Sequence, residues 1–437
     1  MQPLNKPNSL KRVAMATMIG TAIEYFDNYI YTMAAVLIFN HQFFHAADPL
    51  SGQIAALSTL ALTFIARPLG AILFGHFGDR FGRKNTFVIS LLVMGVSTMV
   101  IGLLPTYDSI GIWATLLLCL CRIGQGIGLG GEWGGAALVA IENAPEGKRG
   151  WYGTFPQLGA PLGLLLANGV FLLITALFGQ AAMTDWAWRI PFLSSSILVV
   201  IGLYVRLKLA EAPIFVTALD KPQPKTLPMV EVIITHFKPF FLGMLICMAG
   251  YVLFYIMIAF SQIYAKSAPT VSEAGYAMGL GFSPQIFTAL LMYSAVSLAI
   301  SITISGKCID KIGRRIWLIW TTVAVDIFGL ALPYFLENGT TVSLFWFLII
   351  GMGLIGMGYG PLSSFLPELF PTHVRYTGAS LTYNIAGLFG ASVAAIIALP
   401  LNANYGLKGV GIYLTLNAVL SLIGLWFITE TRDRQLL

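Results

Sequence analysis

The chain has 437 residues, of which 57% are hydrophobic and only 10% charged, and its mean hydropathy is +0.80. Because a soluble domain carries about 25% charged residues, this composition excludes an ordinary soluble protein. The net charge of +6 comes from bases in the chain ends and in the segments between apolar stretches, without stacking aromatic residues, which excludes a nucleic-acid-binding surface.

Twelve apolar segments follow one another, each near the length of about 20 residues that an α-helix needs to cross a bilayer. They cover 13–39, 52–75, 86–105, 112–140, 152–178, 188–208, 239–264, 284–306, 316–336, 342–366, 376–400 and 408–429. We therefore expect an all-α membrane protein with twelve transmembrane helices in two six-helix bundles. The bundles should cover 1–208 and 239–437, and the proline-rich, mixed-charge stretch 209–238 should form a cytoplasmic linker.

The first segment carries two acids, Glu24 and Asp27, which share one helix face with Tyr31. A charge inside the bilayer costs several kcal/mol, so a functional role is the default hypothesis for each acid. Burial disfavours the charged carboxylate, whereas a nearby arginine favours it. Protonation should then depend on which side of the membrane the site faces, as proton coupling requires. Glu24 and Asp27 are equal candidates for the proton carrier.

Two arginines, Arg67 and Arg122, also fall near the middle of predicted helices. The guanidinium of Arg67 can hold a carboxylate through two parallel hydrogen bonds, which favours an anionic substrate. The alternative is an ion pair between Arg67 and an acid of the first segment. Further candidates for the lining of a substrate cavity are Tyr31, Gln157, Tyr383 and Asn384.

The turn 75–84 after the second segment returns as 306–315, 231 positions later, with its glycine, acid and base positions kept. In the first copy, Gly75 permits close helix approach and Gly82 a tight turn. Asp79 can face the positive end of a neighbouring helix. A second repeat, Glu142 to Arg149, returns 226 positions later as Glu368 to Arg375. Such duplication points to a transporter built from two related halves.

Basic residues are distributed asymmetrically: 20 of the 25 lie on one side of the predicted membrane, together with both chain ends. The positive-inside rule makes that side the cytoplasm. The four cysteines suggest no disulfide or metal pair, and the five histidines lack metal-ligand spacing. We find no nucleophile–base constellation, so we expect no enzyme, no metal and no cofactor.

Six stretches carry a closer resemblance: Ile23-Glu-Tyr-Phe-Asp27, Arg67-Pro-Leu-Gly70, Arg122-Ile-Gly-Gln-Gly126, Gly130-Gly-Glu-Trp-Gly-Gly135, Trp188-Arg-Ile-Pro-Phe192 and Glu211-Ala-Pro-Ile-Phe215. With the repeated turn, they resemble the major facilitator superfamily and, within it, the bacterial metabolite:proton symporter branch. Members of that branch carry shikimate, α-ketoglutarate, citrate, or proline and betaine. The resemblance covers essentially the whole chain.

The resemblance implies alternating access, with an acid on the first helix opposite Arg122 as the proton-coupling pair; Asp27 takes that place and Glu24 rivals it. It also implies that the repeated turns latch the inner gate, with the gating residues Gly75, Asp79, Arg80, Gly82, Arg83, Glu132, Asp310, Gly313 and Arg314. We expect a monomeric, proton-coupled importer of a small organic anion in a bacterial inner membrane. Gly159-Ala-Pro161-Leu-Gly163 loosely resembles a motif of drug exporters, so a proton antiporter is the alternative.

Overall fold

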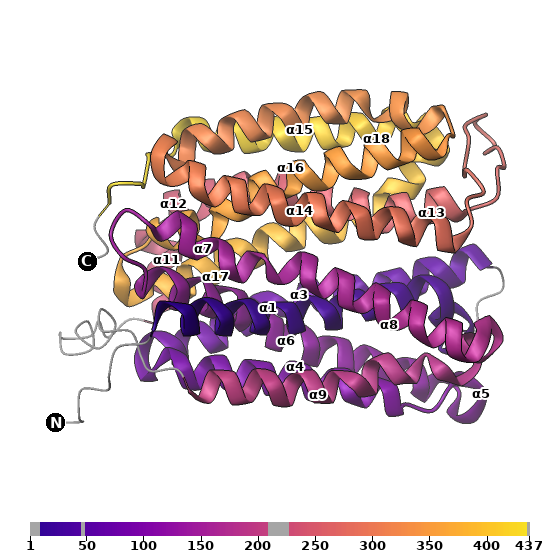
Figure 1. The fold of residues 1–437 in the computed structure, drawn as a ribbon, viewed down its shortest axis with the longest axis horizontal. Coiled ribbons are helices and arrows are strands. Elements are labelled where there is room, and N and C mark those ends of the chain that lie inside the picture. The colour runs from indigo at the N-terminus through magenta and orange to yellow at the C-terminus, as the bar shows by residue number, and fades with distance from the viewer. Residues whose placement is uncertain (1–8, 45–48, 209–226, 435–437) are drawn as a thin grey trace.

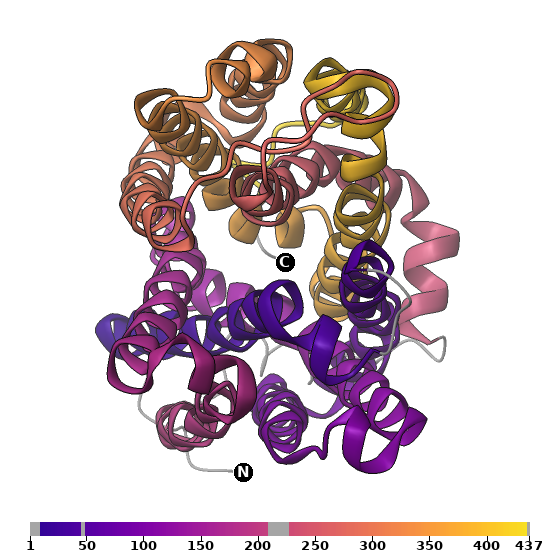
Figure 2. The ribbon, with the colours of Figure 1, turned by 90° about the vertical axis from the view of Figure 1, so that its right-hand side faces the viewer.

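The computed structural model describes residues 9–44, 49–208 and 227–434, almost all of them in helices. The long helices run side by side in two groups, one from each half of the chain (Figure 1). Helix α1 begins, and α18 ends, at the same end of the molecule, which we call the terminal end. Seen from the opposite end, the two groups face each other across the middle of the molecule (Figure 2).

The first half contains six long elements, and the second half follows the same plan. The first comprises α1 (Leu10–Ala34), α3 (Pro49–Phe81), α4 (Arg83–Leu103), α6 (Ile112–Glu142), α7 (Arg149–Gln157) continued by α8 (Gly159–Ala182), and α9 (Arg189–Leu207). The second comprises α12 (Phe237–Tyr255) continued by α13 (Ser261–Lys266), α14 (Pro284–Ile312), α15 (Arg314–Glu337), α16 (Thr341–Glu368), α17 (Arg375–Gly387) and α18 (Val393–Phe427).

Shorter helices and helical turns lie between or beside these long elements. They are η1 (Ala35–Phe39), α2 (Asn40–Gln42), α5 (Tyr107–Ile110), η2 (Met183–Ala187), α11 (Pro228–Thr235), η3 (Ile256–Phe260), η4 (Thr372–Val374) and η5 (Leu388–Ser392). Most of the predicted linker lies outside the described residues. Its end forms α11, which packs beside α3 and α17. There Glu231 contacts His373 of η4, with 2.5 Å between Oε1 and Nε2.

Ten stretches of the described chain are long and apolar enough to cross a membrane. One of them, Thr372–Phe427, has 56 residues and would reach about 84 Å as a single helix, far beyond a bilayer core of about 30 Å. Its backbone leaves helical geometry at Gly406, with φ at 65°, so it supplies two spans. Helix α1 adds another, because its acids lower its hydropathy but not its length of 25 residues. The predicted fold class is confirmed.

The glycine-proline stretch of α8 packs tightly against α1. A Cβ atom at Gly159 would lie 2.6 Å from the backbone nitrogen of Ala22, and one at Gly163 would lie 2.7 Å from that of Phe26. Only residues without a side chain allow this approach. The stretch therefore has a packing role, which holds α1 and its acids in place.

Candidate functional site

A cavity lies between the two halves, and its wall divides into a polar and an apolar part. Its lining includes Asn28 and Arg67 from the first half and Tyr251, Tyr255 and Tyr383 from the second. The opposite wall comes from α14, α15 and α16 and is largely aliphatic: Leu298, Leu318, Val325, Leu354, Ile355 and Leu362. Thr321, Thr322 and Tyr359 are the polar residues of that wall, so the cavity is amphipathic, with its charged group on the other side.

Arg67 is the one charged side chain among the described residues that line the cavity. It is 7% exposed, and its guanidinium carbon lies 4.5 Å from the centre of the Phe64 ring. Within the described residues it has no carboxylate within 4 Å, and its Nε makes no hydrogen bond. An arginine held in this way can bind an anion from the cavity.

Glu24 lies close to this arginine without pairing with it. The side chain is buried, and its Oε2 makes no hydrogen bond with any described residue. The charged groups that interact electrostatically with it are Glu132, Arg67 and Arg206. The charge of Glu24 therefore opposes that of Arg67 in the part of the molecule where an anion would bind.

Asp27 occupies a separate polar cluster inside the first half. Its Oδ2 accepts a hydrogen bond from Thr98 Oγ1 at 2.7 Å, and its Oδ1 accepts one from Ser195 Oγ at 2.6 Å. Gln125 donates from Nε2 to Thr98 Oγ1 at 2.7 Å, and Arg122 donates from Nη1 to Gln125 Oε1 at 2.6 Å. Asp27 and Arg122 are therefore connected through two intervening side chains. The direct pairing that the resemblance implied is absent from the described contacts.

The four residues that we expected to line the cavity fall into two groups. Tyr383 does line it and stacks on Trp133, with ring centres 3.9 Å apart. Tyr31 does not, because its ring lies under Arg122 and its hydroxyl bonds to Thr59 inside the first half.

Gln157 and Asn384 instead bridge the two halves. Gln157 accepts from Trp133 Nε1 at 3.2 Å and donates to Tyr359 O at 2.8 Å. Asn384 donates to the carbonyl oxygen of Gly130 at 3.0 Å. Both amides are buried in the interface between the halves, where their hydrogen bonds are already made to protein groups.

The first copy of the repeated turn contacts the second half at the terminal end. Asp79 accepts hydrogen bonds from the backbone nitrogens of Tyr376 and Thr377, at 3.2 and 3.0 Å, and from Thr377 Oγ1 at 2.8 Å. These residues form the first turn of α17, whose free N–H groups and positive dipole end favour a carboxylate. A Cβ atom on Gly75 would lie 2.9 Å from the Thr377 Cα, so the glycine permits the approach.

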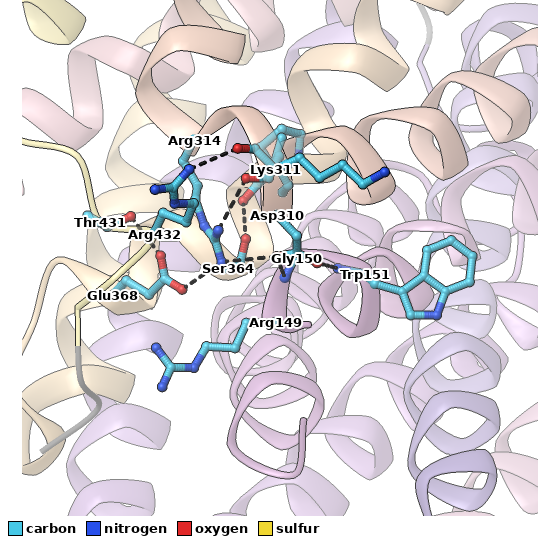
Figure 3. A network of polar contacts seen from close by, with 12 residues as sticks. Arg149, Gly150, Trp151, Asp310, Lys311, Arg314, Ser364, Glu368, Thr431 and Arg432 are labelled. Carbon is cyan, nitrogen blue, oxygen red and sulfur yellow. Dashed lines mark hydrogen bonds and ion pairs between the residues drawn. The ribbon is translucent and has the colours of Figure 1, made fainter. Parts of the chain in front are cut away.

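The second copy mirrors this contact. Asp310 accepts hydrogen bonds from the backbone nitrogens of Gly150 and Trp151, at 2.8 and 2.9 Å, in the first turn of α7 (Figure 3). Each half therefore caps a helix of the other with one carboxylate. Gly82 and Gly313 form the turns after these acids, with φ at 122° and 105°.

Ion pairs surround the two caps. Arg314 contacts Asp310 and Glu368, at 3.4 and 3.2 Å, and Glu368 also accepts from Thr431 Oγ1 at 2.6 Å (Figure 3). Across the halves, Arg375 Nη1 lies 3.4 Å from Glu142 Oε1. These hydrogen bonds and ion pairs thus join the two halves at the terminal end.

Three further residues were predicted to take part in gating. Glu132 pairs with Arg206 inside the first half, because α6 turns this side chain toward α9 and away from the second half. Arg80 is half-buried at the terminal end. The side chain of Arg83 lies outside the described part of the structure.

Sequence reasoning missed Thr98, Gln125 and Ser195 because hydroxyl and amide side chains in a helix carry no distinctive pattern. It also used Glu142 and Glu368 only as markers of duplication. Their recurrence, each a few residues before an arginine, was the signal for the ion pairs at the terminal end.

The caps can be tested by weakening one of them. Asp79→Asn removes the charge that faces the first turn of α17; charged hydrogen bonds contribute about 1.5–3 kcal/mol, so we expect about a tenfold or larger rise in opening at the terminal end. A cysteine at Ser363, which is buried where the halves meet, reports this opening through its rate of alkylation by an impermeant maleimide.

The background protein would have its four native cysteines replaced. Asp433→Asn is the matched control, because that acid is exposed and, among the described residues, forms its ion pair with its neighbour Arg432. Equal alkylation rates in the Asp79 variant and the control would show that the cap does not hold the halves together.

Two duplicated helical halves, a central cavity and interlocking caps at one end define the fold and site of a secondary transporter. Residues 17–395 match the model of the Major Facilitator Superfamily, and the chain belongs to that family. It is a metabolite transporter of this superfamily rather than an enzyme.

Relatives and a solved structure agree with this assignment. The chain is 88% identical to a putative metabolite transport protein of Haemophilus influenzae, over 100% of this chain and 97% of the relative. It is 47% identical to the inner membrane metabolite transport protein YhjE of Escherichia coli, over 98% and 96% of the two chains. The fold resembles that of the proton:xylose symporter XylE of E. coli, with a TM-score of 0.75, 16% identity, and coverage of 98% and 97%.

Proposed function

We propose that this protein imports a small organic anion together with protons, by alternating access between its two halves. The observation that carries the proposal is Arg67, an unpaired guanidinium in the wall of the central cavity. A permanent cation in a largely uncharged cavity attracts an anion and disfavours a cation. Family membership supports transport of a metabolite, and the proton-coupled mode is our inference.

Coupling follows from the acids of α1. When Glu24 is ionised, its negative charge competes with a substrate anion for the field of Arg67. Protonation of Glu24 removes that competition, so the proton and the anion bind together. Release of the proton on the other side restores the competition and expels the anion. This gives symport without any direct contact between proton and substrate.

Asp27 acts in the same direction through a longer connection. The chain of Thr98 and Gln125 links the charge of Asp27 to the orientation of Arg122, which lies over the Tyr31 ring. Neutralising Asp27 weakens its hold on the Thr98 hydroxyl and loosens this chain. The first half thereby changes its packing when a proton binds.

Gln125→Leu cuts this connection and provides a test. Leucine cannot bond to Thr98 or to Arg122, so we expect proton-driven accumulation to fall about tenfold while substrate exchange stays near the wild-type rate. Both quantities are measured in proteoliposomes with a radiolabelled substrate. Gln180→Leu, at an exposed position, is the control. An unchanged accumulation ratio would remove the connection from the coupling mechanism.

The proposed function itself is tested by recording internal pH in oriented proteoliposomes while carboxylates, betaines and anionic drugs are added outside. Proton entry with one class of compound, absent in Arg67→Ala vesicles, supports symport of that class. Proton release from acid-loaded vesicles during uptake of a compound would instead establish antiport. No proton movement with any compound would refute proton coupling.

A further inference from the structure

Two side chains in the cavity wall have polar atoms without partners. Asn28 and Arg67 both line the cavity and are 6% and 7% exposed. Within the described residues, Asn28 Oδ1 and Arg67 Nε make no hydrogen bond. Buried polar groups are nearly always bonded, and leaving one unbonded costs about 1–3 kcal/mol. Two such groups around one cavity indicate a ligand that supplies their partners.

The charge of the cavity limits that ligand. Arg67 is the one charged group in the described lining, and it matches one carboxylate. A second carboxylate would be buried without a counter-charge, at a cost of several kcal/mol. The lining thus favours a monocarboxylate over a dicarboxylate.

Hydrogen bonding limits the identity of the ligand further. The Oδ1 of Asn28 needs a donor, which a carboxylate lacks and a hydroxyl provides. The Tyr251 hydroxyl faces that of Tyr383, and a hydroxyl both donates and accepts, so this pair can still bond to a carboxylate oxygen or a second hydroxyl. The polar side of the cavity therefore matches a carboxylate that carries at least one hydroxyl group.

The opposite wall of the cavity is best matched by a hydrocarbon surface on the ligand. Its side chains are mainly aliphatic, and its polar side chains already have partners. Thr321 donates to Trp317 O at 3.0 Å, Thr322 donates to Leu318 O at 2.8 Å, and the Tyr359 hydroxyl bonds to that of Tyr25 at 2.6 Å. The two threonine hydroxyls have already used their donors. A molecule with polar groups along its whole outline would leave some of them unbonded against this wall.

We propose that the transported anion is a hydroxylated monocarboxylate with an apolar body. Its carboxylate binds Arg67, a hydroxyl donates to Asn28, and its hydrocarbon face lies against α14, α15 and α16. This inference rests on the proposed function and narrows its substrate class. The competing ligand is a carboxylate with a quaternary ammonium, which the tyrosine rings of the lining would hold by cation–π contact without a counter-ion.

Binding to the purified wild-type protein tests this inference without transport. The change in total tryptophan fluorescence reports occupancy of the cavity, because Trp133, one of nine tryptophans, stacks on the lining residue Tyr383. The probes are cyclohexanecarboxylate, its 3-hydroxy and 3,4-dihydroxy derivatives, succinate and glycine betaine. Since a neutral hydrogen bond contributes about 0.5–1.5 kcal/mol, we expect each hydroxyl to tighten binding about twofold to tenfold.

Variants assign the effect to residues. Asn28→Ala should remove the advantage of the hydroxylated probes and leave binding of the parent acid unchanged, whereas Asn404→Ala, at an exposed position, should change neither. The parent acid, succinate or glycine betaine could instead bind more tightly than the hydroxylated acids, with binding that still depends on Arg67. That result would overturn the inferred substrate class and leave the proposed function standing. Failure of every carboxylate to bind would refute the proposed function as well.

Discussion

Proteoliposomes that contain Asp27→Asn are expected to exchange substrate across the membrane but not to accumulate it. A gradient of one pH unit is worth about 1.36 kcal/mol per proton and sustains about a tenfold accumulation of a monovalent anion that enters with one proton. In the variant this ratio should fall to about one, because a first half whose Asp27 is permanently neutral changes its packing whether or not a proton is bound. Asparagine keeps the shape of the protonated acid and an oxygen for Ser195 or Thr98, so the carrier stays locked in its protonated form.

Glu24→Gln separates the two acids of α1. If Glu24 controls Arg67 directly, its glutamine variant should bind the anion without a pH dependence, whereas Asp27→Asn should keep that dependence in binding. Asp185→Asn, at an exposed site near the opposite end, is the control for both. Wild-type accumulation by Asp27→Asn would exclude Asp27 from coupling and leave Glu24 as the proton carrier.

Arg67→Lys is expected to raise the substrate concentration for half-maximal uptake about 10- to 100-fold. Lysine keeps the positive charge but has no planar fork, so the second of two charged hydrogen bonds, worth about 1.5–3 kcal/mol, is lost. Maximal exchange at saturating substrate should change far less, because the caps at the terminal end do not involve this residue. Concentration curves for counterflow measure both quantities.

Arg12→Lys is the control for replacing an arginine by a lysine elsewhere in the chain, because Arg12 is an exposed residue in the first turn of α1. An unchanged half-saturation constant in Arg67→Lys would remove Arg67 from the substrate site. The anion would then have to bind elsewhere, and both the proposed mechanism and the inferred substrate class would fail together.

The sequence by itself determined the class of this protein. Apolar length and low charge dictate membrane helices, because the bilayer core cannot accept unpaired backbone or charged groups. Two repeats at nearly equal offsets, 231 and 226 positions, predict two related halves. Arg67, Glu24 and Asp27 also stand out from sequence alone, since a charge in an apolar segment is costly enough to require a reason. The assignment to the family confirms the class.

Tertiary structure decided which groups these residues meet. A helix pattern shows that Tyr31 shares a face with Asp27, but only packing shows that this part of the face points into the first half rather than into the cavity. The partners of Asp79 and Asp310 include backbone N–H groups, which every residue possesses, so the sequence indicated that Asp79 faces the start of a helix but not which helix. Likewise, Gln125 and Thr98 connect Asp27 to Arg122 only because three helices bring them within hydrogen-bonding distance. Hydropathy and charge act along the chain, whereas hydrogen bonds at 2.6–3.0 Å depend on how helices distant in sequence are placed.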